Sequence, residues 1–116
     1  MRNAVFVAIV GAVSLAASGA APDCSGVERW ATKSAHSYLL SEGIVTRESL
    51  DLTKTRTELL ASEKIGADMY RQVHHVSFAR RDGAVVDVIT KNEASSQECS
   101  MSPVTVYVVS KRLGGK

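Results

Sequence analysis

Histidine, serine and acidic side chains carry most of the acid–base and metal chemistry in proteins, so they are the candidate functional residues of this sequence. His74 and His75 are adjacent in the sequence. Neighbouring side chains on a β-strand point to opposite faces, so these two imidazoles cannot bind one metal ion without distorting the strand. The third histidine, His36, is expected on the solvated face of a helix. We therefore predict no metal site and no cofactor, with His74 at the edge of the core and His75 at the surface.

Nucleophile and phosphate motifs are absent from the sequence. No Gly-x-Ser-x-Gly elbow and no glycine-rich phosphate loop occurs, and the acidic residues are scattered. A glycosidase would need two carboxylates across a cleft, for which so short a chain leaves little room. The alternative to a non-enzymatic function is a small enzyme or ligand-binding carrier. Its candidate pocket would lie between helix and sheet and use Tyr70, His74 and Tyr107.

A polar stretch from Lys91 to Ser102 is the candidate binding loop. Ordered loops of this length in compact domains are often binding loops. Glu93, Gln97 and Met101 are the side chains that we expect it to present to a protein partner. The alternative is a solvated connection whose only role is to carry a cysteine.

Two cysteines, Cys24 and Cys99, are the only ones in the chain. An even number of cysteines in an exported protein indicates a disulfide, and two cysteines allow one pairing. A metal pair would need further ligands nearby, and a catalytic thiol would more plausibly stand alone. The bond would close a long loop, which the chain-entropy model values at roughly 4 kcal/mol.

The first 20 residues have the pattern of a secretory signal peptide. Arg2 is followed by an uncharged run from Ala4 to Ala17, which is shorter than the roughly 20 residues that span a bilayer. Ser18 and Ala20 satisfy the small-x-small cleavage rule, so the mature chain is expected to begin at Ala21. An uncleaved membrane anchor is the alternative. Residues 21–116 then form a single small domain that is secreted or periplasmic.

Charge and composition exclude some partners. The formal charge is +2, and it falls to +1 when Arg2 leaves with the signal peptide. Such a surface exerts no long-range attraction on nucleic acid, and no basic run is present. No segment of the mature domain is apolar enough for membrane insertion. The sequence specifies no oligomeric state.

One amphipathic helix is predicted from Ser25 to Ser41. Ser25 and Glu28 have the spacing of a capping box, and Gly43 suits the left-handed position that ends a helix. Trp30, the only tryptophan, is expected to anchor the helix on the core. The predicted apolar stripe consists of Val27, Trp30, Ala31, Ser34, Ala35, Tyr38 and Leu39. The predicted solvent face consists of Glu28, Arg29, Thr32, Lys33, His36 and Ser37.

Four strands are predicted after the helix. The first runs from Leu50 to Lys64, where residues 58–64 have an alternative as a short helix. Met69 to Arg80 and Ala84 to Thr90 follow as a hairpin. The last, from Pro103 to Lys111, is so rich in β-branched residues that we expect it to be well buried.

The turn of that hairpin allows two registers. A two-residue loop would set Phe78 opposite Asp87. A three-residue loop would set Phe78 opposite Val86 and Val76 opposite Val88. The second register makes one continuous apolar face, and we predict it for that reason.

The predicted fold class is α+β, with one N-terminal helix packed on a four-stranded antiparallel sheet. In architecture alone, this layout resembles that of cystatin-like and other small secreted inhibitor domains. The predicted function is a secreted or periplasmic binding or inhibitor-type module that docks on a protein through the loop, a sheet edge or the open sheet face. A structural envelope protein without a dedicated site is a further alternative.

Overall fold

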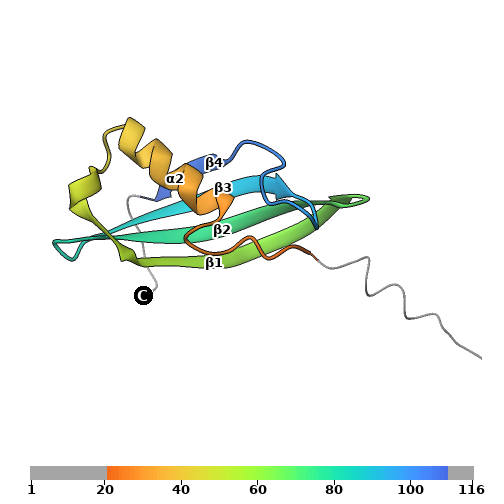
Figure 1. Cartoon of the computed structure of the whole chain (residues 1–116), viewed down its shortest axis with the longest axis horizontal. Helices are drawn as coiled ribbons and strands as arrows, with labels where there is room; N and C mark the ends of the chain where they lie inside the picture. Colours follow the sequence, from red (N-terminus) through yellow and green to blue (C-terminus); the bar gives the residue numbers. More distant parts are fainter. Residues whose placement is uncertain (1–20, 110–116) are drawn as a thin grey trace, which may run out of the picture.

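A computed structural model describes residues 21–109 and shows an α+β fold (Figure 1). One α-helix, a short 3-10 helix and four strands make up this part of the chain. The elements are α2 (Trp30–Ser41), η2 (Arg47–Ser49), β1 (Leu50–Gly66), β2 (Met69–Arg80), β3 (Val85–Ala94) and β4 (Thr105–Val109). The predicted signal peptide and the end of the fourth predicted strand lie outside the described residues.

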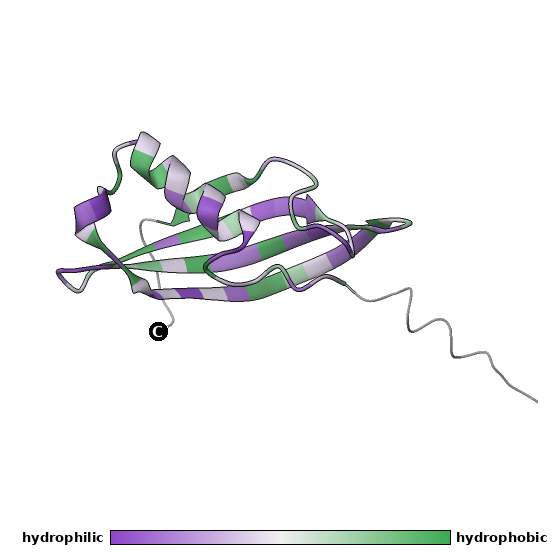
Figure 2. Cartoon of the chain, in the orientation of Figure 1, coloured by the Kyte–Doolittle hydropathy of each residue, from purple (hydrophilic) through white to green (hydrophobic). Residues whose placement is uncertain are grey.

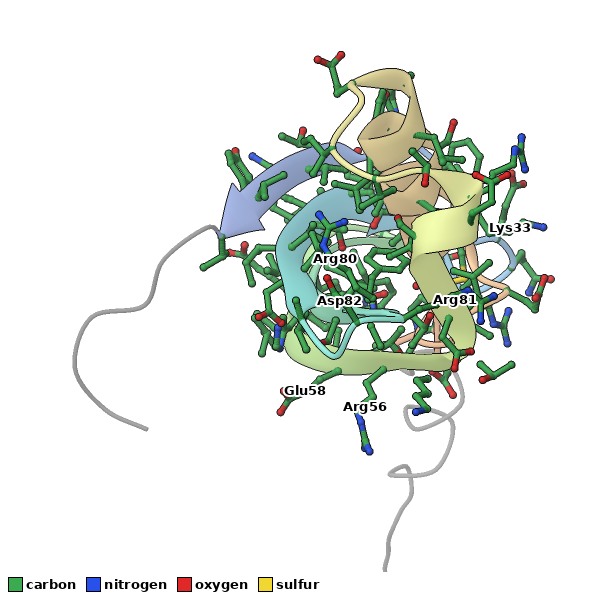
Figure 3. All side chains as sticks on the ribbon, turned by 90° about the vertical axis from the view of Figure 1, so that its left-hand side faces the viewer. Lys33, Arg56, Glu58, Arg80, Arg81 and Asp82 are labelled. Atoms are coloured by element: carbon green, nitrogen blue, oxygen red, sulfur yellow. A yellow bond between two sulfur atoms is a disulfide. The ribbon has the colours of Figure 1, made fainter. Side chains whose placement is uncertain are left out.

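The strands form a single antiparallel sheet in the order β1-β2-β3-β4. The end-on view shows a curved sheet with α2 on its concave side (Figure 3). Arg56 and Glu58 project outward from β1 in the same view. Within the described residues, no helix has the length and hydropathy that crossing a bilayer requires.

The register of the β2–β3 hairpin confirms the prediction. Phe78 pairs with Val86 and Val76 with Val88. Gly83 in the turn has a φ of 99°. Glycine adopts this conformation at little energetic cost because it has no Cβ. The three-residue loop therefore places the apolar side chains of both strands on one face.

The concave face is apolar at one end and polar at the other. The apolar end packs against α2, and its buried cluster consists of Ala35, Leu39, Val45, Leu50, Val76, Phe78, Val86 and Val88. The polar end has four buried side chains at neighbouring positions of β2 and β3: Gln72, His74, Thr90 and Asn92. Figure 2 shows hydrophilic residues, in purple, on the parts of the strands that lie beyond the helix, at the polar end of the face.

Helix α2 begins later than predicted. It starts at Trp30, its N-cap residue is Arg29, and no side chain caps it. The predicted capping box does not form, because the hydroxyl of Ser25 lies 3.1 Å from Nε2 of His74 instead. The helix ends as expected, with Gly43 at a φ of 73°.

The buried face of α2 also differs from the predicted stripe. Its buried residues are Ala31, Thr32, Ala35 and Leu39. Trp30 is 40% exposed, so its predicted role as core anchor is wrong. His36, predicted to be solvated, is half-buried with its ring centroid 5.9 Å from that of Phe78. Small side chains at positions 31 and 35 let the helix approach the sheet closely, which turns the bulkier aromatic residues to its flank.

The strands confirm one further prediction and correct two. β1 remains a strand to Gly66, so the helical alternative for residues 58–64 is excluded. β3 continues to Ala94, so the first four residues of the predicted loop belong to a strand. β4 is an edge strand with exposed Tyr107, Val108 and Val109, whereas its composition predicted burial.

Candidate binding groove

A cleft lies between α2 and the segment that leads into β4. Its volume is about 660 Å³, within the usual range for ligand sites. Aromatic and apolar side chains share its walls with serine hydroxyls and one lysine. The lining residues are Trp30, Lys33, Ser34, Ser37, Tyr38, Ser100, Met101, Ser102, Pro103 and Val104.

A second cleft of about 240 Å³ continues the first along β4. The two share Tyr38 and Val104, so they form one groove between the helix and the edge strand. The second cleft is lined by Tyr38, Leu39, Glu42, Ile44, Val104, Val106 and Val108. We call the two clefts together the α2–β4 groove.

Hydrogen bonds hold the wall of the groove that faces the helix. Nε1 of Trp30 donates to the carbonyl of Ser102 at 3.0 Å. The hydroxyl of Ser102 accepts from the backbone N–H of Glu93 at 2.8 Å, and the N–H of Met101 donates to the carbonyl of Glu93 at 3.1 Å. The segment before β4 is therefore tied to both α2 and β3, which gives the groove a fixed shape.

The three candidate loop residues, Glu93, Gln97 and Met101, lie in different surroundings. Glu93 is half-buried near the end of β3. Gln97 is exposed, and its backbone N–H donates to Ser95 Oγ at 3.2 Å. Met101 is 41% exposed and lines the groove. Only Met101 thus belongs to the groove, and the three do not form one surface.

The alternative pocket residues are not brought together. Tyr70 and His74 are 3% and 1% exposed and occupy the concave face. Tyr107 pairs with Ile89 and is 52% exposed. Because side chains alternate along a strand, Tyr107 lies on the convex face, away from the other two. A site that uses all three is excluded by this register.

The polar end of the concave face fastens the N-terminal segment, residues 21–25. Nε2 of Gln72 donates to the carbonyl of Pro22 at 3.0 Å, and His74 contacts Ser25. The predicted disulfide between Cys24 and Cys99 is confirmed, with Cα atoms 5.7 Å apart. Hydrogen bonds and a covalent bond thus fix this segment, and we call it the N-terminal strap.

The contact between Ser25 and His74 joins a hydroxyl to a base, as in some nucleophilic sites. Burial lowers the pKa of His74 below 6.5, and the nearby Asp23 carboxylate partly offsets this. Neither Ser25 nor His74 lines the α2–β4 groove. The geometry assigns the pair a structural role in holding the strap.

The other two histidines also sit among partners. Nε2 of His75 lies 2.7 Å from Oδ1 of Asp87 on the convex face, and Nδ1 lies 4.0 Å from Glu58. Burial, together with the charge of Arg47, lowers the pKa of His36. Among residues 21–109, no group of three or more histidine, cysteine or acidic side chains could hold a metal ion.

Comparison with models of protein families, with curated protein sequences and with solved structures finds no match. The function is therefore inferred from the geometry of the chain itself.

Sequence reasoning did not identify most of the groove residues. Tyr38 was assigned to the core, and Val106 and Val108 to a buried strand. No signal within the strand could have found them, because the uncharged, valine-rich segment from Thr105 to Val109 suits a central strand as well as an edge.

Proposed function

We propose that this chain is a secreted or periplasmic protein-binding module that docks on its partner through the α2–β4 groove. The observation that carries the proposal is the groove itself, whose walls carry exposed aromatic and apolar side chains beside serine hydroxyls. Soluble domains rarely expose contiguous apolar surface without a use, and such surface commonly marks an interaction site.

The composition of the groove supports a protein partner. Trp30 and Tyr38 are 40% and 47% exposed, and aromatic residues dominate the binding energy of many interfaces. Met101 adds a flexible apolar side chain, of the kind that adapts to differently shaped partners. The groove floor near β4 is formed by valines, which offer apolar contact without charge.

Export is supported by two independent features. The first 20 residues have the signal-peptide pattern, and the Cys24–Cys99 disulfide is a bond that oxidising compartments maintain. Mass spectrometry of the exported protein tests this part: a mature N-terminus at Ala21 is expected, and retention of Met1 would contradict it.

Selection from a random peptide library tests the binding function. Peptides that bind the oxidised domain are expected to lose about tenfold or more in affinity, at least 1.4 kcal/mol, for Val108→Glu. Val85→Glu is the matched control, because Val85 is also an exposed strand valine but lies outside the groove. Circular dichroism confirms that both variants fold. Equal losses in both variants, or no enriched peptide, would overturn the proposal.

A further inference from the structure

One edge of β4 has no partner among the described residues. β4 is the last strand in the sheet order and pairs only with β3. The five residues from Thr105 to Val109 carry no charge. Charged side chains, prolines and bulges are the usual protection of an edge strand, and β4 has none of these between its ends. β1, the opposite edge, is protected by register irregularities and by charges such as Arg56 and Glu58.

The hairpin identifies the backbone groups of β3 that point toward β4. The N–H of Arg80 donates to the carbonyl of Ala84 at 2.8 Å. Hydrogen-bonded pairs alternate along an antiparallel ladder, and the β2–β3 register shows no shift, so the even-numbered residues of β3 point their backbone groups to β2. The odd-numbered residues, among them Ile89, therefore point theirs to β4.

The same alternation identifies the free groups of β4. Tyr107 pairs with Ile89, so its N–H and C=O are directed at β3. The N–H and C=O groups of Val106 and Val108 are consequently directed at the free edge. The side chains of these same two valines line the groove. Backbone groups that have no partner among residues 21–109 thus coincide with apolar side chains along one strip of the surface.

From this coincidence we infer that the groove receives an extended segment of the partner protein, which adds to β4 as a fifth, antiparallel strand. The inference rests on the proposed function and specifies its mode. Added strands gain affinity from main-chain hydrogen bonds and specificity from alternate side chains. Every second side chain of the segment enters the groove beside Tyr38 and Ile44, and the others lie on the convex side beside Tyr107.

The dimensions of both walls agree with such an occupant. The five residues of β4 span about 17 Å as a strand. The 12 residues of α2 span about 18 Å as a helix. A segment of roughly five or six residues therefore fills the groove from end to end.

Charges at the two ends give the segment a polarity. Lys33 lines the cleft near Pro103, where β4 is about to begin, and Glu42 lines the cleft near Val108. An antiparallel segment has its N-terminal end at Glu42 and its C-terminal end at Lys33. The helix dipole adds to this preference, because the C-terminal end of α2 is negative and its N-terminal end positive. The segment is thus basic near its start, apolar at alternate positions and acidic near its end.

This chemistry argues against a second copy of the chain as the occupant. In an antiparallel β4–β4 pair, the added strand would be Thr105–Val109 itself, which carries neither a base for Glu42 nor an acid for Lys33. A partner strand with charges at both ends is the better match.

Amide hydrogen exchange measured by NMR on the oxidised domain tests the inference. The probe is a capped peptide of sequence Lys-Thr-Val-Thr-Val-Thr-Glu, in which the two charges and the valines share the face that enters the groove. Exchange at Val106 and Val108 is expected to slow by about tenfold or more on binding, as for amides that enter a ladder. Tyr107 is the internal control, because its N–H already faces β3. A peptide with the two charges exchanged is expected to bind several-fold more weakly.

Val108→Pro, compared with Val108→Ala, separates the backbone contribution from side-chain contacts, because both variants remove the valine side chain and only the first removes the N–H. Among the described residues this N–H bonds nothing within the sheet, so the fold is expected to persist in both variants while peptide binding is lost in Val108→Pro and only weakened in Val108→Ala. Peptide binding that perturbs Tyr38 and Ile44 without protecting Val106 and Val108 would overturn strand addition and leave the proposed function standing. Protection that rises with protein concentration in the absence of peptide would identify a second copy as the occupant and overturn the inference.

Discussion

Removal of the disulfide is the perturbation whose magnitude follows most directly from the structure. Cys24 and Cys99 are 75 positions apart in the sequence, and no free cysteine is present. For a loop of that length, the chain-entropy model gives a contribution of about 4.5 kcal/mol at 25 °C. A small domain is stable by only about 5–15 kcal/mol, so the double variant Cys24→Ala/Cys99→Ala is expected to lose a large share of its stability.

Urea unfolding followed by circular dichroism measures this loss. Alanine is the appropriate replacement, because Cys24 is 3% exposed and a serine would bury a hydroxyl. The midpoint should fall, and the slope should rise, because the unfolded chain without its cross-link exposes more surface. Wild-type protein reduced with dithiothreitol is the matched control and should resemble the double variant.

Two results would refute this reasoning. A loss below about 1 kcal/mol would show that the loop is already restricted in the unfolded state. A change in the slope that reduction of the wild type does not reproduce would show that the alanines, rather than the absent bond, cause the effect. Ser25→Ala removes the hydrogen bond between Ser25 and His74, the other attachment of the strap. It is expected to lower the free energy of unfolding by about 1 kcal/mol, the usual contribution of one hydrogen bond.

Four further substitutions test the assigned positions. Leu39→Ala should cost about 2–5 kcal/mol in urea unfolding, because this side chain is 1% exposed; Trp30→Ala should cost less, and the reverse order would contradict the helix face. His75→Ala should change the free energy of unfolding by no more than about 1 kcal/mol, because its pair with Asp87 is partly exposed. The lowered pKa of His74 means that, below about pH 6.5, the unfolded chain binds a proton that the folded chain does not. The free energy of unfolding should therefore decrease as the pH is lowered through that range, and it should decrease less steeply in His74→Gln. A variant with the same pH dependence as the wild type would show that His74 is not the group responsible.

Local patterns predicted much of the sheet correctly. The bounds of β2 were predicted to the residue, because turn residues precede it at 65–68 and follow it at 81–83. The hairpin register was predicted because one of two alternatives joined Phe78 and Val86 on a single apolar face. Prediction of the disulfide required only the number of cysteines and the expectation that the protein is exported to an oxidising compartment. In each case, the deciding information lay within the segment or in composition.

The helix face and the exposure of β4 depended on information outside their own segments. The sequence of α2 allows several apolar stripes, and the small size of Ala31 and Ala35 selected one only because a sheet lies close by. The valines of β4 suit a central strand as well as an edge. β3 was predicted to end at Thr90 because the alternation of hydrophobic residues stops there. The strand continues because Asn92 faces the polar end of the concave face, where a buried polar side chain fits.

The width of one helix accounts for the open strand beside it. A helix with its side chains is about 10 Å wide, and neighbouring strands lie about 4.8 Å apart, so α2 covers roughly two strands of the four. The strap occupies the polar end of the concave face, where Gln72 and His74 hold it by hydrogen bonds. On the groove side of β4, Val106 packs against the core cluster, whereas Val108 is apolar and 43% exposed. A partner strand added at this edge would therefore both extend the sheet and bury Val108.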